Sequence, residues 1–504
     1  MTAHALSKAP PVTDGRRRWI ALYVLCAGML MIVLDVTVVN VALPSIQSDL
    51  GFSGSSLAWV VNAYLISFGG LLLLAGRFGD LLGHRRMFLA GLVVFTSASM
   101  VCGLADSQEV LVGARFVQGL GGAMTSAVIL GMIVTMFPEP REQAKAIGVY
   151  GFVASAGGSI GLLAGGVLTQ AIDWHWIFFI NVPIGIITAT LAVRLLEPGR
   201  GVGLVQGADV PGALLLVTSL MLGVYTIVVP AAQHGWGAGE TLGLGGASLA
   251  LLVGFLVREA MAARPLIPLR VFRSRDLAGA NLIQALVVAG MFGMFFLGAL
   301  YLQRVLHYDA LTIGLAFLPT TLVMGTMSLR YSEPLVMRFG PRRVLIAGMA
   351  LGALGLGWFA QVPVHDAYVV HVLPALVVLG LGIGGSFPAL MALAMTGAGP
   401  QDAGLASGLV NTTAQVGGAL GLAVLATVAS THSNGLIHHG TSTASALTAG
   451  YHLAFWIGAG LVVVAIATAV FVLESATART PAGVAAGESG RLDEIPAGTC
   501  TEVG

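Results

Sequence analysis

Asp35 is a carboxylate in the middle of an apolar run, Trp19 to Leu43, that is long enough to cross a bilayer. A charged side chain at that depth costs roughly 2.5 to 3.5 kcal/mol on insertion scales, so it is rare without a function. Burial disfavours the charged form of a carboxyl group, and access to water on either side would let it take up and release a proton. We interpret Asp35 as a proton-coupling residue, with a structural hydrogen bond to a neighbouring helix as the alternative.

Arg115 is a second charged side chain inside an apolar segment, about two turns into residues 110–136. Arginine stays protonated in proteins, so its guanidinium needs a partner or water at this depth. A hydrogen bond that only joins two helices would also satisfy it.

Several kinds of chemistry are disfavoured by the rest of the sequence. No motif joins a nucleophile, a base and metal ligands, so we expect neither an enzyme nor a bound cofactor. His432, His438 and His439 have no carboxylate or thiolate beside them, and we predict no metal site there. The two lysines, Lys8 and Lys145, lie outside any GxxxxGK loop, which excludes a self-contained ATPase and leaves an ion gradient as the energy source.

The composition identifies the elements that must position these residues. Of 504 residues, 56% are hydrophobic and 9% charged, whereas soluble domains carry about 25% charged residues. About fourteen apolar segments are long enough to span a bilayer, which predicts an all-α integral membrane protein. The net charge of +1 gives no sign of a nucleic-acid partner.

Lysine and arginine residues predict the orientation in the membrane. They gather before the first segment and in every second loop after it, while the opposite loops contain almost only Arg304. By the positive-inside rule both termini are cytoplasmic. The abundance of Ala, Gly and Arg over Lys is typical of a GC-rich bacterial genome, so we expect a multi-pass protein of the bacterial cytoplasmic membrane.

The chain also repeats itself. Five residues of the fifth segment recur at a constant shift of 260 positions, from Ala146, Gly148, Gly157, Gly158 and Gly161 to Ala406, Gly408, Gly417, Gly418 and Gly421. A nearby shift places Met291 opposite Asp35, so the acid is present in one half only. We predict two pseudo-symmetric six-helix bundles with two extra central helices. The division is a cytoplasmic tail 1–18, a first bundle 19–196, two added helices and linkers 197–276, a second bundle 277–473, and a disordered cytoplasmic tail 474–504.

Five stretches carry a family resemblance. Residues 76–86, GRFGDLLGHRR, look like the loop signature between spans two and three of the major facilitator superfamily, and 115–121, RFVQGLG, resemble its fourth-span motif. Residues 35–44, DVTVVNVALP, with 174–183, WHWIFFINVP, look like its fourteen-span drug:proton antiporters. Residues 157–166 resemble the fifth-span antiporter motif, except that Leu162 stands where the motif usually has proline.

The resemblance implies roles for individual residues. Arg115 would take part in proton transfer together with Asp35. The loop signature would form a conformational latch, through Gly76, Asp80, Gly83, Arg85 and Arg86, in which ion pairs break as the bundles move; ordinary topology anchoring by the two arginines is the alternative. The antiporter motif comprises Gly157, Gly161, Gly165 and Gly166, whose small size allows close helix packing.

Polar residues within spans avoid lipid, so we assign Thr37, Asn40, Gln284 and Asn411 to a substrate cavity. The function that follows is proton-coupled efflux of amphipathic drugs or antibiotics by alternating access. A proton-coupled transporter of one specific small metabolite is the alternative, which Leu162 in place of proline keeps open.

Overall fold

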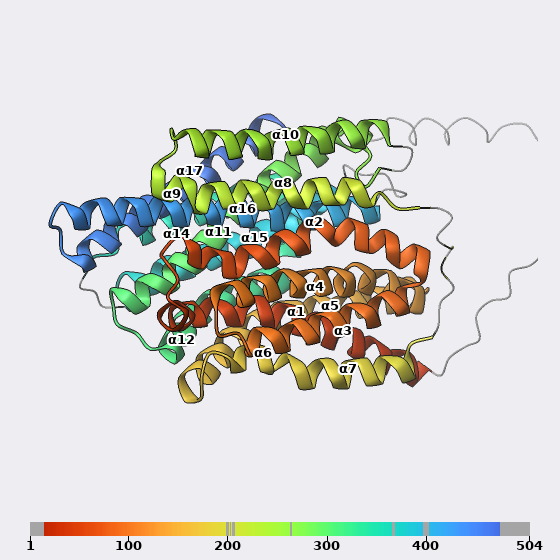
Figure 1. Ribbon diagram of the computed structural model, residues 1–504. Helices are drawn as coiled ribbons and strands as arrows, with labels where there is room; N and C mark the ends of the chain where they lie inside the picture. Colours follow the sequence, from red (N-terminus) through yellow and green to blue (C-terminus); the bar gives the residue numbers. More distant parts are fainter. Residues whose placement is uncertain are drawn as a thin grey trace, which may run out of the picture. The chain divides into compact units, whose positions relative to one another are not determined.

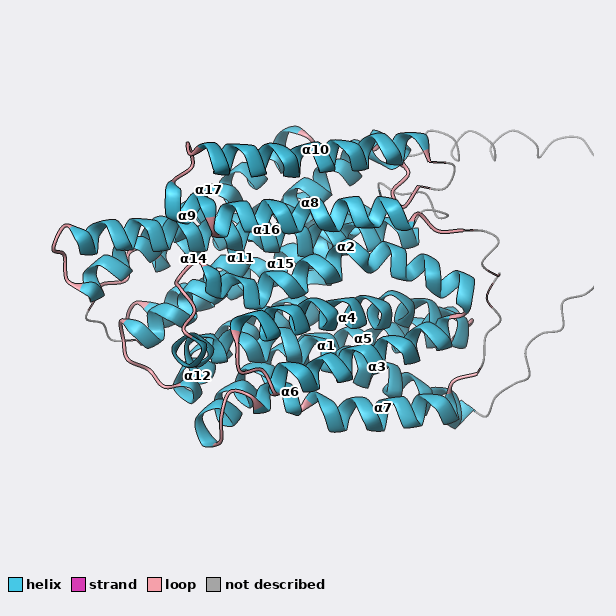
Figure 2. Ribbon diagram, in the orientation of Figure 1, coloured by secondary structure: helices cyan, strands magenta, loops and turns pink. Residues whose placement is uncertain are grey.

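The computed structural model describes residues 15–197, 201, 203, 207–262, 265–364, 368–396 and 403–473. Every regular element in these ranges is a helix, and short loops join the helices (Figure 2). Fourteen helical stretches within them are long and apolar enough to cross a membrane. The all-α membrane fold expected from the sequence is confirmed. Residues 1–14 and 474–504, most of the two expected tails, lie outside the described residues.

The first six spans pack on one another (Figure 1). Helix α1 contacts α4, α5 and α7, while α3 contacts both α4 and α7. The sixth span is divided into a short α6 and a longer α7. The bounds are α1 Gly15–Leu50, η1 Ser56–Ala58, α2 Trp59–Leu82, α3 His84–Gly103, α4 Gln108–Met136, α5 Pro140–Ala171, α6 Trp176–Phe179 and α7 Asn181–Leu195.

Two further spans follow, and they lie beside the bundles (Figure 1). Helix α8 packs against α2 and α16, whereas α10 packs mainly against α8. The added pair is therefore central in the sequence but peripheral in space. The bounds are α8 Val210–Val228, α9 Pro230–His234 and α10 Gly239–Met261.

The last six spans repeat the arrangement of the first six. Helix α11 contacts α16 and α17, and α14 contacts α15 and α17. Helix α12 runs through one π-helical turn, η4, into α13. The bounds are η3 Leu269–Arg273, α11 Arg275–Arg304, α12 Ala310–Thr326, η4 Met327–Tyr331, α13 Ser332–Phe339, α14 Pro341–Phe359, α15 Val372–Thr396, α16 Ala403–His438 and α17 Thr443–Phe471.

The sequence repeat reappears as a repeat in helix packing. A Cβ added to Gly161 of α5 would lie 1.9 Å from Thr37 Oγ1 of α1, and one added to Gly421 of α16 would lie 2.2 Å from Ala289 Cβ of α11. Gly161 and Gly421 are 260 positions apart, the shift found in the sequence. Both crossings therefore depend on the missing side chain, which allows the two backbones to approach closely.

A second pair of glycines marks the repeat in the loops. Gly83 joins α2 to α3 with φ +100°, and Gly340 joins α13 to α14 with φ +82°. Only glycine adopts such backbone angles without strain. The chain therefore reverses direction through a glycine between the second and third spans of each half.

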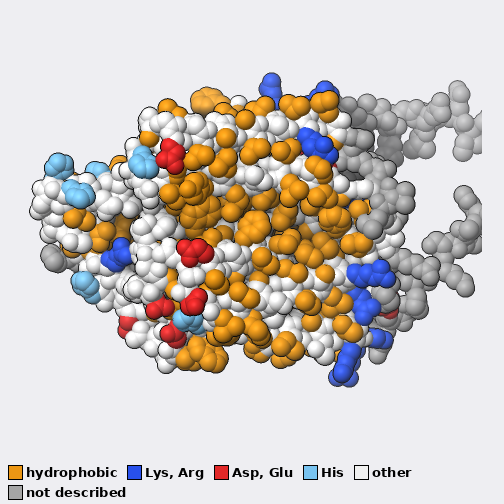
Figure 3. All heavy atoms as spheres, in the orientation of Figure 1, with side chains coloured by type: hydrophobic (Ala, Val, Ile, Leu, Met, Phe, Trp, Pro, Cys, Tyr) orange, Lys and Arg blue, Asp and Glu red, His pale blue; other side chains and the backbone are white. Residues whose placement is uncertain are grey.

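The two halves meet through matching helices, because α5 contacts α12 and α16 contacts α2. On the face shown in Figure 3, apolar side chains cover the middle while Lys and Arg side chains gather mostly at the right-hand end. Large apolar residues such as Leu249 and Val253 of α10 are exposed, as expected for a lipid-facing helix. The residue boundaries that we give for the two bundles remain our proposed division.

Candidate functional site

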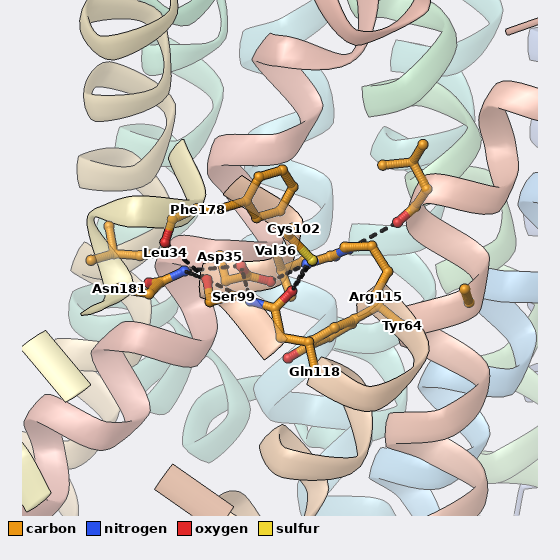
Figure 4. Close-up of polar contacts among 12 residues, drawn as sticks. Leu34, Asp35, Val36, Tyr64, Ser99, Cys102, Arg115, Gln118, Phe178 and Asn181 are labelled. Atoms are coloured by element: carbon orange, nitrogen blue, oxygen red, sulfur yellow. Dashed lines mark hydrogen bonds and ion pairs between the residues drawn. The ribbon is translucent and has the colours of Figure 1, made fainter. Parts of the chain in front are cut away.

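Asp35 and Arg115 form a fully buried ion pair inside the first bundle (Figure 4). Arg115 Nη1 donates to Asp35 Oδ2 at 2.5 Å, and the Arg115 and Asp35 side chains expose 1% and 0% of their surface. Arg115 Nε donates to the carbonyl oxygen of Val60 on α2. Burying two charges is costly, and close contact with extra hydrogen bonds offsets that cost. The partner that each charge needs at this depth is therefore the other charge.

A shell of polar side chains orients the pair. Gln118, one turn after Arg115 on α4, donates from Nε2 to Asp35 Oδ1 at 2.6 Å and accepts from Arg115 Nη1 at 2.8 Å. Asn181 of α7 donates from Nδ2 to Asp35 Oδ1 at 3.1 Å and to Ser99 Oγ at 3.0 Å. Ser99 of α3 donates in turn to the carbonyl oxygen of Phe178. Both carboxylate oxygens are thus held by donors from other helices.

Aromatic rings cover the guanidinium. The Arg115 Cζ atom lies 4.4 Å from the centre of the Tyr64 ring and 5.7 Å from that of Phe178. Such cation–π contacts strengthen when they are desolvated. Residues of α1, α2, α3, α4 and the α6–α7 region therefore converge on one charged pair, which couples its state to the packing of the whole bundle.

A cavity of about 740 Å³ lies beside this network. Its wall includes one face of α1, formed by residues at helical spacing, together with parts of α2, α4 and α16. The volume is in the range of drug-sized ligand sites. The α1 wall residues are Met29, Ile32, Val33, Val36 and Thr37.

The cavity extends to the end of the helices where α2 joins α3. Gly76, Asp80 and His84 line it there, together with Asp209 at the start of α8. At the other end the two halves touch, since a Cβ added to Gly54 would lie 2.9 Å from Ser430 Oγ of α16. The cavity therefore reaches the α2–α3 end, whereas the two halves touch at the opposite end.

Of the four residues assigned to the cavity from sequence, Thr37 and Asn411 line it, and Asn40 and Gln284 do not. Asn40 donates from Nδ2 back to the carbonyl oxygen of Val36 in its own helix. Gln284 is buried within the second bundle. Polarity identifies residues that avoid lipid, but it does not tell a helix face toward the cavity from one toward a neighbouring helix.

The expected latch residues lie together at the α2–α3 end but do not form ion pairs with one another. Asp80 Oδ1 lies 3.3 Å from Nε2 of His84, which pairs with it when protonated. Arg85 Nη2 donates to the carbonyl oxygen of Val193 at 2.5 Å, and Arg86 is exposed. The role of these residues as a conformational latch remains our prediction.

The glycines of the fifth-span motif face two different helices. Gly157, Gly161 and Gly165 abut α1, whereas a Cβ on Gly166 would lie 2.9 Å from the carbonyl oxygen of Ala310 on α12. Helix α5 continues without a break through Leu162, whose carbonyl oxygen would lie 2.5 Å from a Cβ on Gly314. The motif therefore forms both the α1 contact and a contact between the two halves.

Sequence reasoning missed Gln118, Asn181, Ser99 and Tyr64 as partners of the pair. The first two lie inside motifs that we had identified, and Gln118 is three positions after Arg115, which places both on one helix face. The polarity of Gln118 and Asn181 within spans was a usable signal. Among the described residues, no group of three or more His, Cys, Asp or Glu side chains could hold a metal ion.

Comparisons with known proteins agree with this architecture. The model of the Major Facilitator Superfamily matches residues 25–422. The cephamycin export protein CmcT of Amycolatopsis lactamdurans is 41% identical over 468 residues, covering 92% of this chain and 94% of that protein. The puromycin resistance protein pur8 of Streptomyces alboniger is 38% identical over 487 residues, covering 95% of each chain. A crystal structure of a bacterial homologue of the human lysosomal transporter Spinster has a TM-score of 0.65 at 16% identity, covering 91% of this chain and 97% of that one.

Proposed function

Because this chain belongs to the major facilitator superfamily, we propose that it exports amphipathic antibiotics or drugs across the bacterial cytoplasmic membrane in exchange for protons. It is a transporter and not an enzyme. Its relatives of 38% and 41% identity are named for puromycin resistance and cephamycin export, which supports antibiotic-like substrates here.

One observation carries the proposal: a drug-sized cavity between two similar bundles lies beside Asp35, a buried acid of the first bundle that the repeat matches with Met291 in the second. Rocking of the bundles would expose the cavity to each side of the membrane in turn. Protonation of Asp35 would remove one charge of the pair and release Arg115, so the packing of the first bundle would respond to the proton. Asp35 and Arg115 are therefore our proposed proton-coupling residues, with Gln118 and Asn181 as positioning residues.

The orientation in the membrane follows from basic residues at one end of the helices. Arg17 at the start of α1 contacts the carbonyl oxygen of Arg194 at the end of α7, and Arg85 reaches the same region. By the positive-inside rule we propose that this end faces the cytoplasm, which supports a cytoplasmic location for both termini. The cavity would then be open to the cytoplasm, ready to receive substrate.

A proton gradient is sufficient as the energy source. One charge moving through 100 mV releases about 2.3 kcal/mol, and each pH unit adds about 1.4 kcal/mol. Uphill export of a neutral or singly charged amphipath by several orders of magnitude needs no more than one or two protons. Asp35, which is buried in the first bundle, is our proposed binding site for one of these protons.

A drug panel tests the function directly. Expression in a host lacking its own exporters is expected to raise tolerance to at least one antibiotic and to lower its accumulation, and a protonophore should abolish both effects. Proteoliposomes with an imposed pH gradient then separate broad efflux from the alternative, transport of one specific metabolite. Unchanged tolerance and accumulation for every compound, with protein present in the membrane, would reject export of drugs.

A further inference from the structure

Tyr64 of α2 lines the cavity and also packs against the guanidinium of the Asp35–Arg115 pair. The other side chains that contact the pair, such as Gln118 and Asn181, are absent from the cavity wall. Figure 4 shows the Tyr64 ring alongside the guanidinium. Tyr64 therefore connects the cavity wall to the buried charges.

The contacts of Tyr64 hold its ring in place while leaving its hydroxyl free. Its ring centre lies 4.4 Å from Arg115 Cζ, and the Phe68 ring stacks with it at 5.7 Å between ring centres. A Cβ on Gly122 of α4 would lie 2.9 Å from Tyr64 Oη, and a Cβ on Gly119 would lie 2.4 Å from the Tyr64 carbonyl oxygen. The two glycines let α2 approach α4 closely enough for the ring to cover the guanidinium.

The hydroxyl itself is buried and has no hydrogen-bond partner. An unpaired buried hydroxyl is costly, so a conformation in which it gains a partner is favoured. A cavity occupant with an acceptor group, or cavity water, would provide that partner once the ring turns. The ring is thus restrained by packing and not by a hydrogen bond of its own.

We propose that Tyr64 is a movable seal between the substrate cavity and the Asp35–Arg115 pair. An amphipathic substrate that enters the cavity displaces the ring, the guanidinium loses its aromatic cover, and cavity water reaches the carboxylate. A proton then moves between that water and Asp35. Substrate and proton would act at separate sites, and Tyr64 is a positioning residue that links them. The inference rests on the proposed function.

Proton flow without substrate tests the seal. Purified variants are reconstituted in liposomes that contain a pH-sensitive dye, and acidification is followed after an imposed pH gradient. Tyr64→Leu and the more volume-conserving Tyr64→Met are expected to conduct protons about tenfold faster than wild type, because water exclusion and a desolvated cation–π contact are both lost. Tyr64→Phe keeps the ring and is expected to remain near the wild-type rate.

Two controls make the result specific. Phe359→Leu removes a buried aromatic ring of α14 in the second bundle, outside the cavity wall, and it is expected to stay near the wild-type rate. The double variant Tyr64→Leu with Asp35→Asn should lose the extra proton flow, because the group that carries the proton is gone. Flow through other wall carboxylates, Asp80 and Asp209, would persist in the double variant and would overturn the assignment.

The outcomes also distinguish this inference from the proposed function. Wild-type rates in both folded variants, Tyr64→Leu and Tyr64→Met, would overturn the seal even if wild type exports drugs. If no compound of the panel is exported by wild type but the proton flow follows the expected pattern, the seal stands and the assignment of drug export fails. Elution as a single species in detergent shows that a variant is folded.

Discussion

Asp35 and Thr37 are two positions apart in α1 and face different surroundings. Thr37 lines the cavity, whereas the Asp35 side chain is sealed within the first bundle. Successive residues of a helix are turned by about 100°, so neighbouring positions reach separate sites. A substrate that contacts the Thr37 face does not touch the carboxylate in this conformation. We therefore expect substrate and proton to be coupled through conformational linkage and not through direct competition for Asp35.

Replacing Asp35 with Asn is expected to abolish gradient-driven transport. The structure predicts a loss of stability as well. The neutral amide would leave the Arg115 guanidinium buried without a countercharge, which costs about 3 to 5 kcal/mol when one partner of a buried pair is removed. We expect lower thermal stability in detergent together with no uptake of any panel compound into inverted vesicles.

A double variant separates these two effects. Asp35→Asn with Arg115→Gln removes both charges, so most of the lost stability should return while transport remains absent. Recovery of gradient-driven transport in the double variant would show that the pair is structural and that the proton binds elsewhere.

Replacing Gln118 with Ala is expected to lower both the rate of transport and the stability of the protein. The Gln118 amide donates to Asp35 Oδ1 at 2.6 Å and accepts from Arg115 Nη1 at 2.8 Å. A hydrogen bond to a charged group contributes about 1.5 kcal/mol, so its loss should lower the melting midpoint in detergent. Initial rates under one imposed pH gradient should fall about tenfold, because the carboxylate is no longer held in place. A wild-type rate in a variant with a lower melting midpoint would indicate a purely structural role.

Much of the fold could be predicted from the sequence because its signals are physical and local. Apolar length determines the spans, and glycines such as Gly161 and Gly421 mark where two backbones approach each other. Asp35 and Arg115 stood out because charges are rare at membrane depth. The sequence could not show that these two residues pair, since 80 positions separate them and only tertiary packing brings α1 and α4 together.

The cavity was less predictable for a related reason. Asn40 and Asn411 are both polar residues in spans, and each donates to a carbonyl oxygen one turn earlier in its own helix, yet only Asn411 lines the cavity. Their difference depends on how α1 and α16 are rotated within their bundles, which the apolar pattern of a helix buried on most sides does not reveal. Tyr64 gave no signal at all, because an aromatic residue in a span is usually part of the core.

The same two asparagines offer a matched test of the cavity wall. Asn411→Ala is expected to change the apparent KM for individual transported compounds by about fivefold, the equivalent of one hydrogen bond of about 1 kcal/mol. Asn40→Ala removes the same group from a position outside the cavity and should leave KM unchanged. Competition assays against one fluorescent substrate compare the two variants. Equal effects of both substitutions on every compound would argue that this cavity is not where substrates bind.

Replacing Gly161 with Ala is expected to destabilise the protein through the contact between α1 and α5. The new Cβ would lie 1.9 Å from Thr37 Oγ1, so the helices must move apart, and overpacking of this kind typically costs about 1 to 3 kcal/mol. Gly158→Ala is the matched control, because a Cβ there meets nothing within 4 Å and alanine favours the helix. Melting of the purified protein in detergent, followed by tryptophan fluorescence, should show a lower midpoint for the first variant only.

A compensating change identifies the contact responsible. Thr37→Ala removes the hydroxyl that the new Cβ would meet, so adding it to Gly161→Ala should restore part of the lost stability. The two effects should be non-additive, as expected for residues in direct contact. Because Thr37 also lines the cavity, the double variant is expected to melt close to wild type yet to differ from it in substrate preference. Strictly additive losses would place the strain elsewhere along α5, for instance at Gly165 against Val38.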